Sequence, residues 1–174
     1  MRFERVTSTQ HSRYGEALAL YGSSFPFHEQ RQARSQAEIL GNEAYAFNLI
    51  YDGGAFVGLL LCWETKTFIY VEHFCILPSM RNKKYGQKAL ELLERKGKTV
   101  ILEIDPPVDA LSLRRRAFYE RAGFVENPYA HTHPAYHANY PGHALVVMSC
   151  PAPLTEAAYQ EFFTYLKTVV MGGV

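Results

Sequence analysis

The chain has 174 residues, of which 48% are hydrophobic and 20% charged, with 18 Lys and Arg against 17 Asp and Glu. This length favours a single domain that spans residues 1–174 and has a substantial core. The composition is that of an ordinary globular protein. The net charge of +1 argues against a general nucleic-acid or membrane-surface binder, whose affinity rests on clustered positive charge.

Three cysteines, Cys62, Cys75 and Cys150, are unequally spaced, and no Cys-x-x-Cys pair is present. This pattern favours buried thiols over a zinc knuckle or a redox motif. The first residues lack the apolar core of a signal peptide, and no apolar run reaches membrane length. We expect a cytoplasmic protein, and the sequence leaves both a monomer and a homodimer open.

Apolar periodicity predicts seven strands and five helices along the chain. The expected strands cover residues 3–7, 45–51, 55–63, 68–77, 99–104, 124–125 and 144–149. The expected helices cover residues 13–21, 29–40, 85–96, 111–122 and 155–170. Asp52-Gly53-Gly54 is a strong hairpin signal, and Ser12, Asp109 and Thr155 are expected to cap helices. The link over residues 23–28 is either a packed turn, which we favour, or one wall of a cleft.

This order of elements describes an α/β (α+β) protein with a mixed, mostly antiparallel sheet of six to seven strands flanked by helices. The strand at 99–104 follows a helix, so it is expected to lie parallel to the strand at 68–77. The loop after the latter strand leads into a helix, whose unpaired N–H groups and dipole attract anions. Arg81, Lys83 and Lys84 add positive charge there. The sequence therefore predicts a pyrophosphate-binding turn.

Two segments of the chain resemble the GNAT acetyltransferase superfamily, whose members bind acetyl-coenzyme A. One is Ile76-Leu77-Pro78 followed by Arg81-Asn82-Lys83-Lys84-Tyr85-Gly86, which is similar to the family's V-x-P and R/Q-x-x-G-x-G/A loop. The other is Ala117-Phe118-Tyr119-Glu120-Arg121-Ala122-Gly123-Phe124, close to the family's FYEKLGF segment. The order of elements resembles the family over residues 45–149. Lys84 replaces the first loop glycine, and Ser112 stands where the family often has asparagine.

The resemblance implies that acetyl-coenzyme A is a cosubstrate, that the parallel strands splay apart beside it, and that no metal is needed. The thioester and pantetheine are expected to bond main-chain groups of Cys75, Ile76 and Leu77. The pyrophosphate is expected to contact Arg81, Asn82, Lys83, Lys84, Tyr85, Gly86, Gln87 and Lys88. Ser112 is expected to supply one further side-chain contact.

Transfer of an acetyl group to an amine benefits from a proton acceptor, because an amine with a pKa of about 10.4 is almost wholly protonated at pH 7. Glu72 and His73 are expected on opposite faces of the strand before the loop. By resemblance Glu72 is the first candidate for the base, and His73 is the alternative because its usual pKa is near neutral. Tyr119 resembles the family's general acid, which protonates the departing thiolate. Each of the three also has a structural interpretation, as a solvated or locally bonded side chain.

The segment over residues 129–143 is rich in His and Tyr and is expected to be a loop. Its histidines are His131, His133, His137 and His143. The spacing of the first three is compatible with metal ligation, but no carboxylate or cysteine lies among them. We favour a substrate-side loop, and a surface loop without a specific role is the other alternative.

The sequence therefore predicts an acetyl-coenzyme A-dependent N-acetyltransferase that acts on the primary amine of a small molecule or amino acid derivative. Neither nucleic acid nor a membrane is expected as a partner. The alternative is a GNAT-fold module that senses acyl-coenzyme A without turnover, and Lys84 in place of glycine is the feature that favours it. The sequence does not identify the acceptor amine.

Overall fold

The computed structural model describes residues 1–174. Its strands are β1 (Arg2–Val6), β2 (Tyr45–Asp52), β3 (Ala55–Glu64), β4 (Phe68–Ile76), β5 (Thr99–Ile104), β6 (Val125–Glu126), β7 (His131–His133) and β8 (His143–Cys150). Its helices are α1 (Tyr14–Ser24), α2 (Ala33–Ile39), α3 (Tyr85–Glu94), α4 (Ala110–Arg121) and α5 (Glu156–Tyr165), with short helical turns η1 (Phe27–Glu29), η2 (Pro78–Met80) and η3 (Leu166–Val170). No helix is both long enough and apolar enough to cross a membrane.

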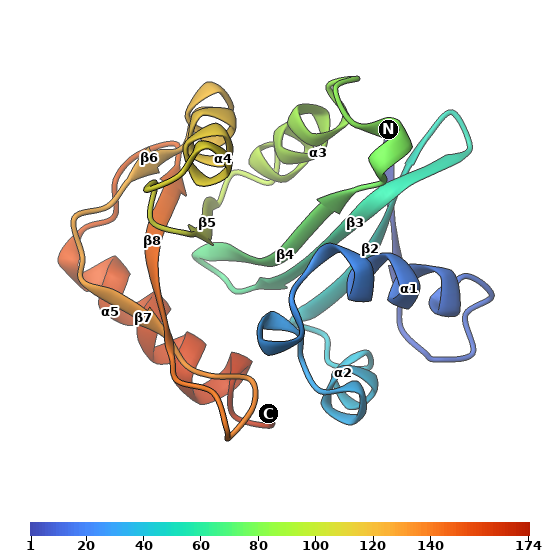
Figure 1. Ribbon diagram of the computed structural model, residues 1–174, viewed down its shortest axis with the longest axis horizontal. Helices are drawn as coiled ribbons and strands as arrows, with labels where there is room; N and C mark the ends of the chain where they lie inside the picture. The colour runs from blue at the N-terminus through green and yellow to red at the C-terminus, as the bar shows by residue number, and fades with distance from the viewer.

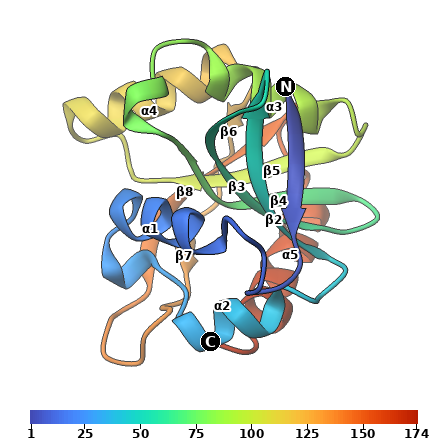
Figure 2. The ribbon, with the colours of Figure 1, turned by 90° about the vertical axis from the view of Figure 1, so that its right-hand side faces the viewer.

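One mixed sheet runs through the molecule in the order β1-β2-β3-β4-β5-β8-β6, and β7 pairs with β8. All neighbouring strands are antiparallel except β4 and β5, which are parallel. Helices α3 and α4 cover one face, and α1, α2 and α5 cover the other (Figures 1 and 2). The expected mixed sheet and its parallel pair are confirmed, with β7 as an additional strand.

Each face of the sheet carries its own apolar core. The larger core packs Phe47 and Trp63 of the sheet with Tyr21 of α1 and Phe162 of α5. The second core packs the opposite face of the sheet against α3 and α4, with Leu90 among its buried residues. Because successive side chains of a strand point to opposite faces and both faces are covered, β3 is apolar along most of its length.

Turns and caps follow the sequence prediction with one exception. Gly53 and Gly54 adopt φ values of 54° and 88° in the β2–β3 hairpin, a backbone region that glycine tolerates. Asp109 and Thr155 cap α4 and α5 with side-chain hydrogen bonds. Ser12 does not cap α1, whose N-terminus has no side-chain cap.

The two N-terminal helices differ from their predicted bounds. Helix α1 continues through Gly22, and α2 begins at Ala33 instead of residue 29. The residues between them form η1 and then an extended segment, which carries Arg31 into the interior. Arg31 forms an ion pair with Glu72 there, and this long-range contact outweighs the local helical pattern.

The predicted loop over residues 129–143 contains the short strand β7. It pairs with β8 in an antiparallel register that joins His131 to Leu145 and His133 to His143. The segment is therefore anchored to the sheet, and only its middle part is a loop.

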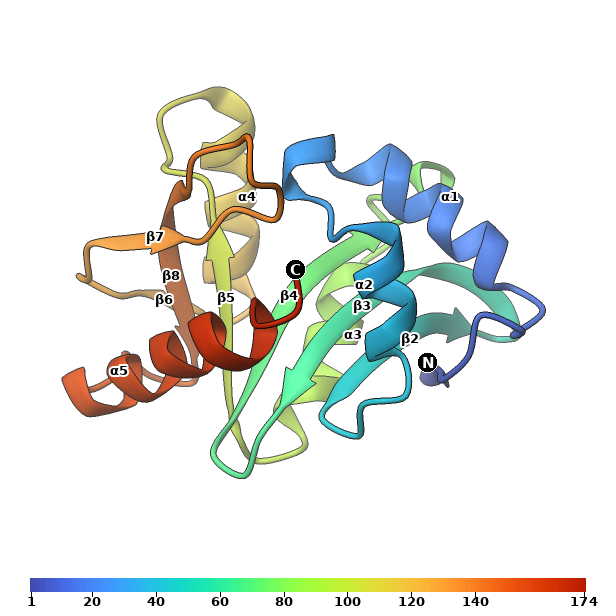
Figure 3. The ribbon, with the colours of Figure 1, turned by 90° about the horizontal axis from the view of Figure 1, so that it is seen from below.

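Strands β4 and β5 separate after a short paired stretch. Their parallel pairing runs from Phe68 and Thr99 to Val71 and Leu102, although β4 continues to Ile76. Figure 3 shows the two strands diverging, with α4 beyond β5. The last part of β4 consequently has no strand partner on its β5 side.

A β-bulge in β4 sets the direction of two candidate residues. Between two successive residues of β3, the pairing on β4 advances from Val71 to His73, so Glu72 is the extra residue. Glu72 and His73 both contact Tyr136 and therefore face the same side of the sheet. The expectation of opposite faces is wrong, because strict alternation holds only where the strand ladder is regular.

Candidate active site

The splayed strands open into a groove with a volume of about 1240 Å³. It is lined by β4, β5, the loop before α3, helix α4, the α1–α2 link and the segment around β7. Near α3 and α4 the lining includes the cationic side chains of Arg81, Lys84, Arg114, Arg115 and Arg121. Near β7 and the α1–α2 link it includes Glu29, Glu72, Glu103, Asp105 and the histidines His28, His73, His133 and His143.

The link between α1 and α2 is one wall of this groove. Ser23, Ser24, Phe25 and His28 are among the lining residues. The Phe25 ring packs edge-on against His73, with ring centroids 4.7 Å apart. The link is therefore the alternative that we did not favour, one wall of a cleft, and its Phe25 also packs against the sheet.

The loop before α3 keeps the backbone shape of a glycine at a position that lacks one. Lys84 is the N-cap residue of α3 and has a φ of 62°, in the left-handed region that favours glycine. A side chain in that region costs on the order of 1–3 kcal/mol. No side chain caps α3, so the first N–H groups of the helix remain available to an anion.

The two motif segments meet at Gly86 and Phe118. A Cβ atom at position 86 would lie 3.0 Å from the Phe118 ring, so glycine permits the close approach of α3 to α4. The loop and the helix that carries Tyr119 are thereby held together on one side of the groove.

The groove brings together most, but not all, of the residues expected to contact the cofactor. Those that line it are Cys75, Ile76, Arg81, Asn82, Lys84, Tyr85, Gly86 and Gln87. Those that do not line it are Leu77, Lys83, Lys88 and Ser112. The Leu77 N–H bonds the Val57 carbonyl across the sheet. The Ser112 hydroxyl is buried in the capping box of α4 with Asp109.

Tyr119 lines the groove from α4 and is 9% exposed. Its ring packs against Phe118 and Phe124, and no protein group hydrogen-bonds its hydroxyl. Burial raises the pKa of the Tyr119 phenol to about 12. The side chain therefore holds its proton at neutral pH and has a hydroxyl free to bond a ligand.

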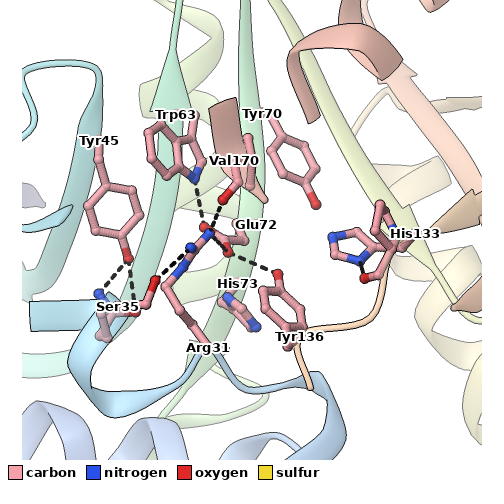
Figure 4. Close-up of polar contacts among 12 residues, drawn as sticks. Arg31, Ser35, Tyr45, Trp63, Tyr70, Glu72, His73, His133, Tyr136 and Val170 are labelled. Carbon is pink, nitrogen blue, oxygen red and sulfur yellow. Dashed lines mark hydrogen bonds and ion pairs between the residues drawn. The ribbon is translucent and has the colours of Figure 1, made fainter. Parts of the chain in front are cut away.

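Glu72 is the centre of a buried polar network (Figure 4). Its Oε1 accepts hydrogen bonds from Arg31 Nη2 at 2.9 Å and from the Tyr136 hydroxyl at 2.9 Å. Its Oε2 accepts from Trp63 Nε1 at 2.7 Å. Burial alone would raise the pKa of this carboxyl, but the charge of Arg31 and these hydrogen bonds hold it at about 2. Glu72 is thus a stable anion whose oxygens are already bonded.

His73 has one engaged and one free ring nitrogen. Its Nε2 lies 2.8 Å from the Glu29 carbonyl oxygen, which only accepts, so Nε2 carries the proton. Its Nδ1 is buried and has no hydrogen-bond partner. Burial lowers the pKa of His73 below the usual 6.5, although the Glu72 charge opposes this. In its neutral form His73 therefore presents an unbonded lone pair.

Sequence reasoning missed Arg31 and Glu103, and it placed His133 and Tyr136 in the His-rich segment without a specific role. Arg31, Glu103, His133 and Tyr136 all belong to the polar networks behind the groove. A charged residue inside the apolar run Thr99–Ile104 was a signal for Glu103. No local signal marks Arg31, which lies 41 residues from Glu72 in the chain.

The three closely spaced histidines of the His-rich segment do not converge on one point. His131 Nε2 bonds the Glu103 carboxylate, and His133 Nδ1 bonds the Pro134 carbonyl. His137 Nε2 bonds the Phe27 carbonyl, and the His137 ring stacks on the Phe27 ring. Because each histidine has a different partner, these three do not form one shared metal site, and the role of the segment toward a substrate stays a prediction.

Comparison with protein families identifies the class of protein. Residues 14–124 match the model of the Acetyltransferase (GNAT) family. Because this match covers more than half of the chain, the protein belongs to the GNAT family and is an acyltransferase by class. The expected family is confirmed. A comparison with curated protein sequences gave no match.

Solved structures agree with this class. A protein from Bacteroides thetaiotaomicron described as a GNAT-family acetyltransferase is 29% identical, with 99% of each chain covered and a TM-score of 0.92. An aminoglycoside 6'-N-acetyltransferase complexed with coenzyme A is 15% identical, with 90% of this chain and 100% of that chain covered and a TM-score of 0.59. A Bacillus subtilis acetyltransferase in complex with coenzyme A is 14% identical, with 85% and 96% covered and a TM-score of 0.57. The two structures with coenzyme A bound share the fold of this chain.

Proposed function

We propose that the protein is an acetyl-coenzyme A-dependent N-acetyltransferase that acts on the primary amine of a small molecule. The observation that carries the proposal is the unbonded hydroxyl of Tyr119, which lines the same groove as the splayed end of β4 and the uncapped N-terminus of α3. Acetyl transfer from acetyl-coenzyme A requires three features: a proton donor for the thiolate, free backbone groups for the pantetheine and an anion site for the pyrophosphate.

In this proposal acetyl-coenzyme A binds along the α3 side of the groove. The first N–H groups of α3 and the side chains of Arg81 and Lys84 hold its pyrophosphate. Main-chain groups of Cys75 and Ile76, on the part of β4 without a β5 partner, bond the pantetheine and orient the thioester. The side chains of Lys83, Lys88 and Ser112 have no direct contact in this arrangement.

His73 is the base that we favour between the two sequence candidates. Glu72 has a pKa of about 2 and three hydrogen bonds, so it takes a proton poorly. His73 Nδ1 has a free lone pair beside the same groove. Glu72 then acts as a positioning residue, because its hydrogen bond orients Tyr136 against the His73 ring.

In the proposed reaction His73 accepts a proton from the substrate and Tyr119 donates one to the leaving thiolate. His73 Nδ1 takes one proton from the ammonium, and the neutral amine nitrogen forms a bond to the thioester carbon. As the carbon–sulfur bond breaks, Tyr119 gives its proton to the departing thiolate, and the second proton of the nitrogen replaces it on Tyr119. The products are an amide, a free thiol and one proton released from His73.

Two measurements test the proposed function. Calorimetry should show saturable binding of acetyl-coenzyme A, and thiol release should then accelerate with at least one member of a panel of primary amines. Saturable binding without amine-dependent thiol release across the panel would favour the sensing module instead. Absence of binding would remove both proposals.

A further inference from the structure

The end of the groove near β7, where the amine substrate would bind, contains a second buried carboxylate, Glu103 of β5. It is the first residue of β5 after the pairing with β4 ends at Leu102. Its Oε2 accepts a hydrogen bond of 2.5 Å from the Tyr70 hydroxyl, and its Oε1 bonds His131. Its side chain is 5% exposed. The basic side chains within 4 Å of this buried carboxylate are those of His131 and His133. Unlike Glu72, it has no arginine or lysine partner.

In its neutral form, His133 presents a lone pair next to this carboxylate. Its Nδ1 lies 2.6 Å from the Pro134 carbonyl oxygen, which only accepts, so Nδ1 carries the proton. Its Nε2 is buried without a hydrogen-bond partner and lies 3.9 Å from Glu103 Oε2. Two acceptors therefore face each other across a distance that a single N–H-bearing group can bridge with one hydrogen bond to each.

The donors around this site are already committed. The Tyr70 hydroxyl donates to Glu103, and the Tyr136 hydroxyl donates to Glu72. Arg31 has a buried Nε without a partner, but Arg31 is not among the residues that line the groove. What remains unsatisfied at this end of the groove is acceptor capacity, on the buried His73 Nδ1 and His133 Nε2 and on Glu103.

The walls of the site are aromatic rings. The Tyr136 ring packs against both imidazoles, with ring centroids 5.8 Å from His73 and 5.0 Å from His133 (Figure 4). Aromatic faces attract cations, and a buried polar atom without a hydrogen-bond partner is unfavourable unless a ligand bonds it. A ligand group that fills this site must therefore be rich in donors, and a positive charge fits it best.

We propose that Glu103 and His133, with His73, form a binding site for the primary ammonium group of an acceptor that carries no carboxylate on the adjacent carbon. An ammonium group has three N–H donors, and two of them can bond Glu103 and His133 across the 3.9 Å between Oε2 and Nε2, which leaves the third for His73. An α-carboxylate would bring further acceptors and negative charge against Glu103, where no donor is free to meet them. Simple amines are thus substrates, and the corresponding α-amino acids are excluded.

This inference rests on the proposed acetyl transfer to an amine, but its test needs no coenzyme A. Protein labelled at histidine with ¹³C and ¹⁵N is titrated with matched pairs, butylamine against norvaline and phenethylamine against phenylalanine, with butanol as the neutral control. We expect saturable shifts of the His133 and His73 ring signals with at least one amine, and binding at least tenfold weaker with the matching amino acid. The His133 signal is assigned by its loss in His133→Gln.

The variant Glu103→Gln removes the charge and should weaken amine binding roughly ten- to a hundredfold. The matched control is Glu38→Gln, because Glu38 is an exposed carboxylate paired only with Arg34 on α2. If Glu103→Gln does not fold, the wild-type titration decides alone. No saturable shift with either amine, or equal binding of amine and amino acid, would overturn the site. Acetyl transfer to amines with no role for Glu103 would overturn the site while leaving the proposed function standing.

Discussion

The Arg31 guanidinium donates a 2.9 Å hydrogen bond to the Glu72 carboxylate, and both side chains are 1% exposed. This ion pair ties the segment before α2 to the bulge of β4, and Arg31 also bonds the Val170 carbonyl of η3. Three parts of the chain that are remote in sequence thus meet behind the groove. Because both side chains are buried, we assign the pair a structural role: it holds Glu72 in the position from which it bonds Tyr136.

Arg31→Met should lower the free energy of unfolding by about 3–5 kcal/mol, because it leaves the Glu72 charge buried without its partner. The double variant Arg31→Met, Glu72→Leu should cost less than Arg31→Met alone, since no buried charge remains. Denaturant unfolding measures both. Arg34→Met is the control, because Arg34 is 90% exposed and its pair with Glu38 contributes little. A loss below about 1 kcal/mol for Arg31→Met would contradict this role for the pair.

Stability should fall as the pH drops from about 4.5 to about 2. The pKa of Glu72 is lower in the folded protein, at about 2, than its ordinary value of 4.5. A depressed carboxyl pKa contributes stability that is fully present above the unfolded value and is lost as the folded value is approached. The contribution is on the order of 3 kcal/mol. Denaturant unfolding at several pH values should show this slope, and Glu72→Gln should flatten it.

Tyr119→Phe should lower kcat by about 10²–10⁴-fold, the usual range for a positioned general acid. The affinity for coenzyme A should change little, because the ring packing against Phe118 and Phe124 is retained. Steady-state kinetics and calorimetry on the same preparation separate the two effects. Unchanged turnover with the best amine would remove Tyr119 from the acid role.

His73→Gln should lower kcat/KM by about 10²–10⁴-fold while leaving the fold intact. The glutamine amide can still donate to the Glu29 carbonyl, but it removes the free lone pair of Nδ1. In the wild-type protein, protonation of His73 abolishes the base, so kcat/KM should fall on the acid side with an apparent pKa below 6.5. The acid limb should be absent in the variant. A wild-type limb that persists in His73→Gln would assign the proton to another group.

Lys84→Gly should raise the free energy of unfolding by about 1 kcal/mol, because Lys84 adopts a φ of 62° that glycine reaches without strain. Lys83→Gly is the matched control, since Lys83 is not among the residues with positive φ. There the added chain entropy of glycine should lower stability by about 0.4–1 kcal/mol. Equal effects at both positions would show that Lys84 stores no backbone strain.

The sequence predicted those parts of the fold that depend on local rules. The Gly53–Gly54 hairpin, the Asp109 cap and the parallel β4–β5 pair each follow from a few neighbouring residues and the order of elements. The loop before α3 was also predicted, because a basic segment between a strand and a helix carries its own signal.

The acceptor side of the site could not be predicted in the same way. The bulge at Glu72 arises from the register between β3 and β4, and the Arg31 partner comes from an extended segment that has the pattern of a helix. The pairing of Glu103 with His131 and His133 requires β7, which sequence reasoning took for a loop. These contacts depend on tertiary register, for which short stretches of sequence carry no signal.

The most direct test of the proposed acetyl transfer is mass spectrometry of amines incubated with acetyl-coenzyme A and the protein. The account predicts an acetylated nitrogen on at least one simple primary amine, with product formation reduced at least a hundredfold in Tyr119→Phe at equal coenzyme A binding. Saturable acetyl-coenzyme A binding without any acetylated amine, or equal product from the wild-type protein and Tyr119→Phe, would contradict it.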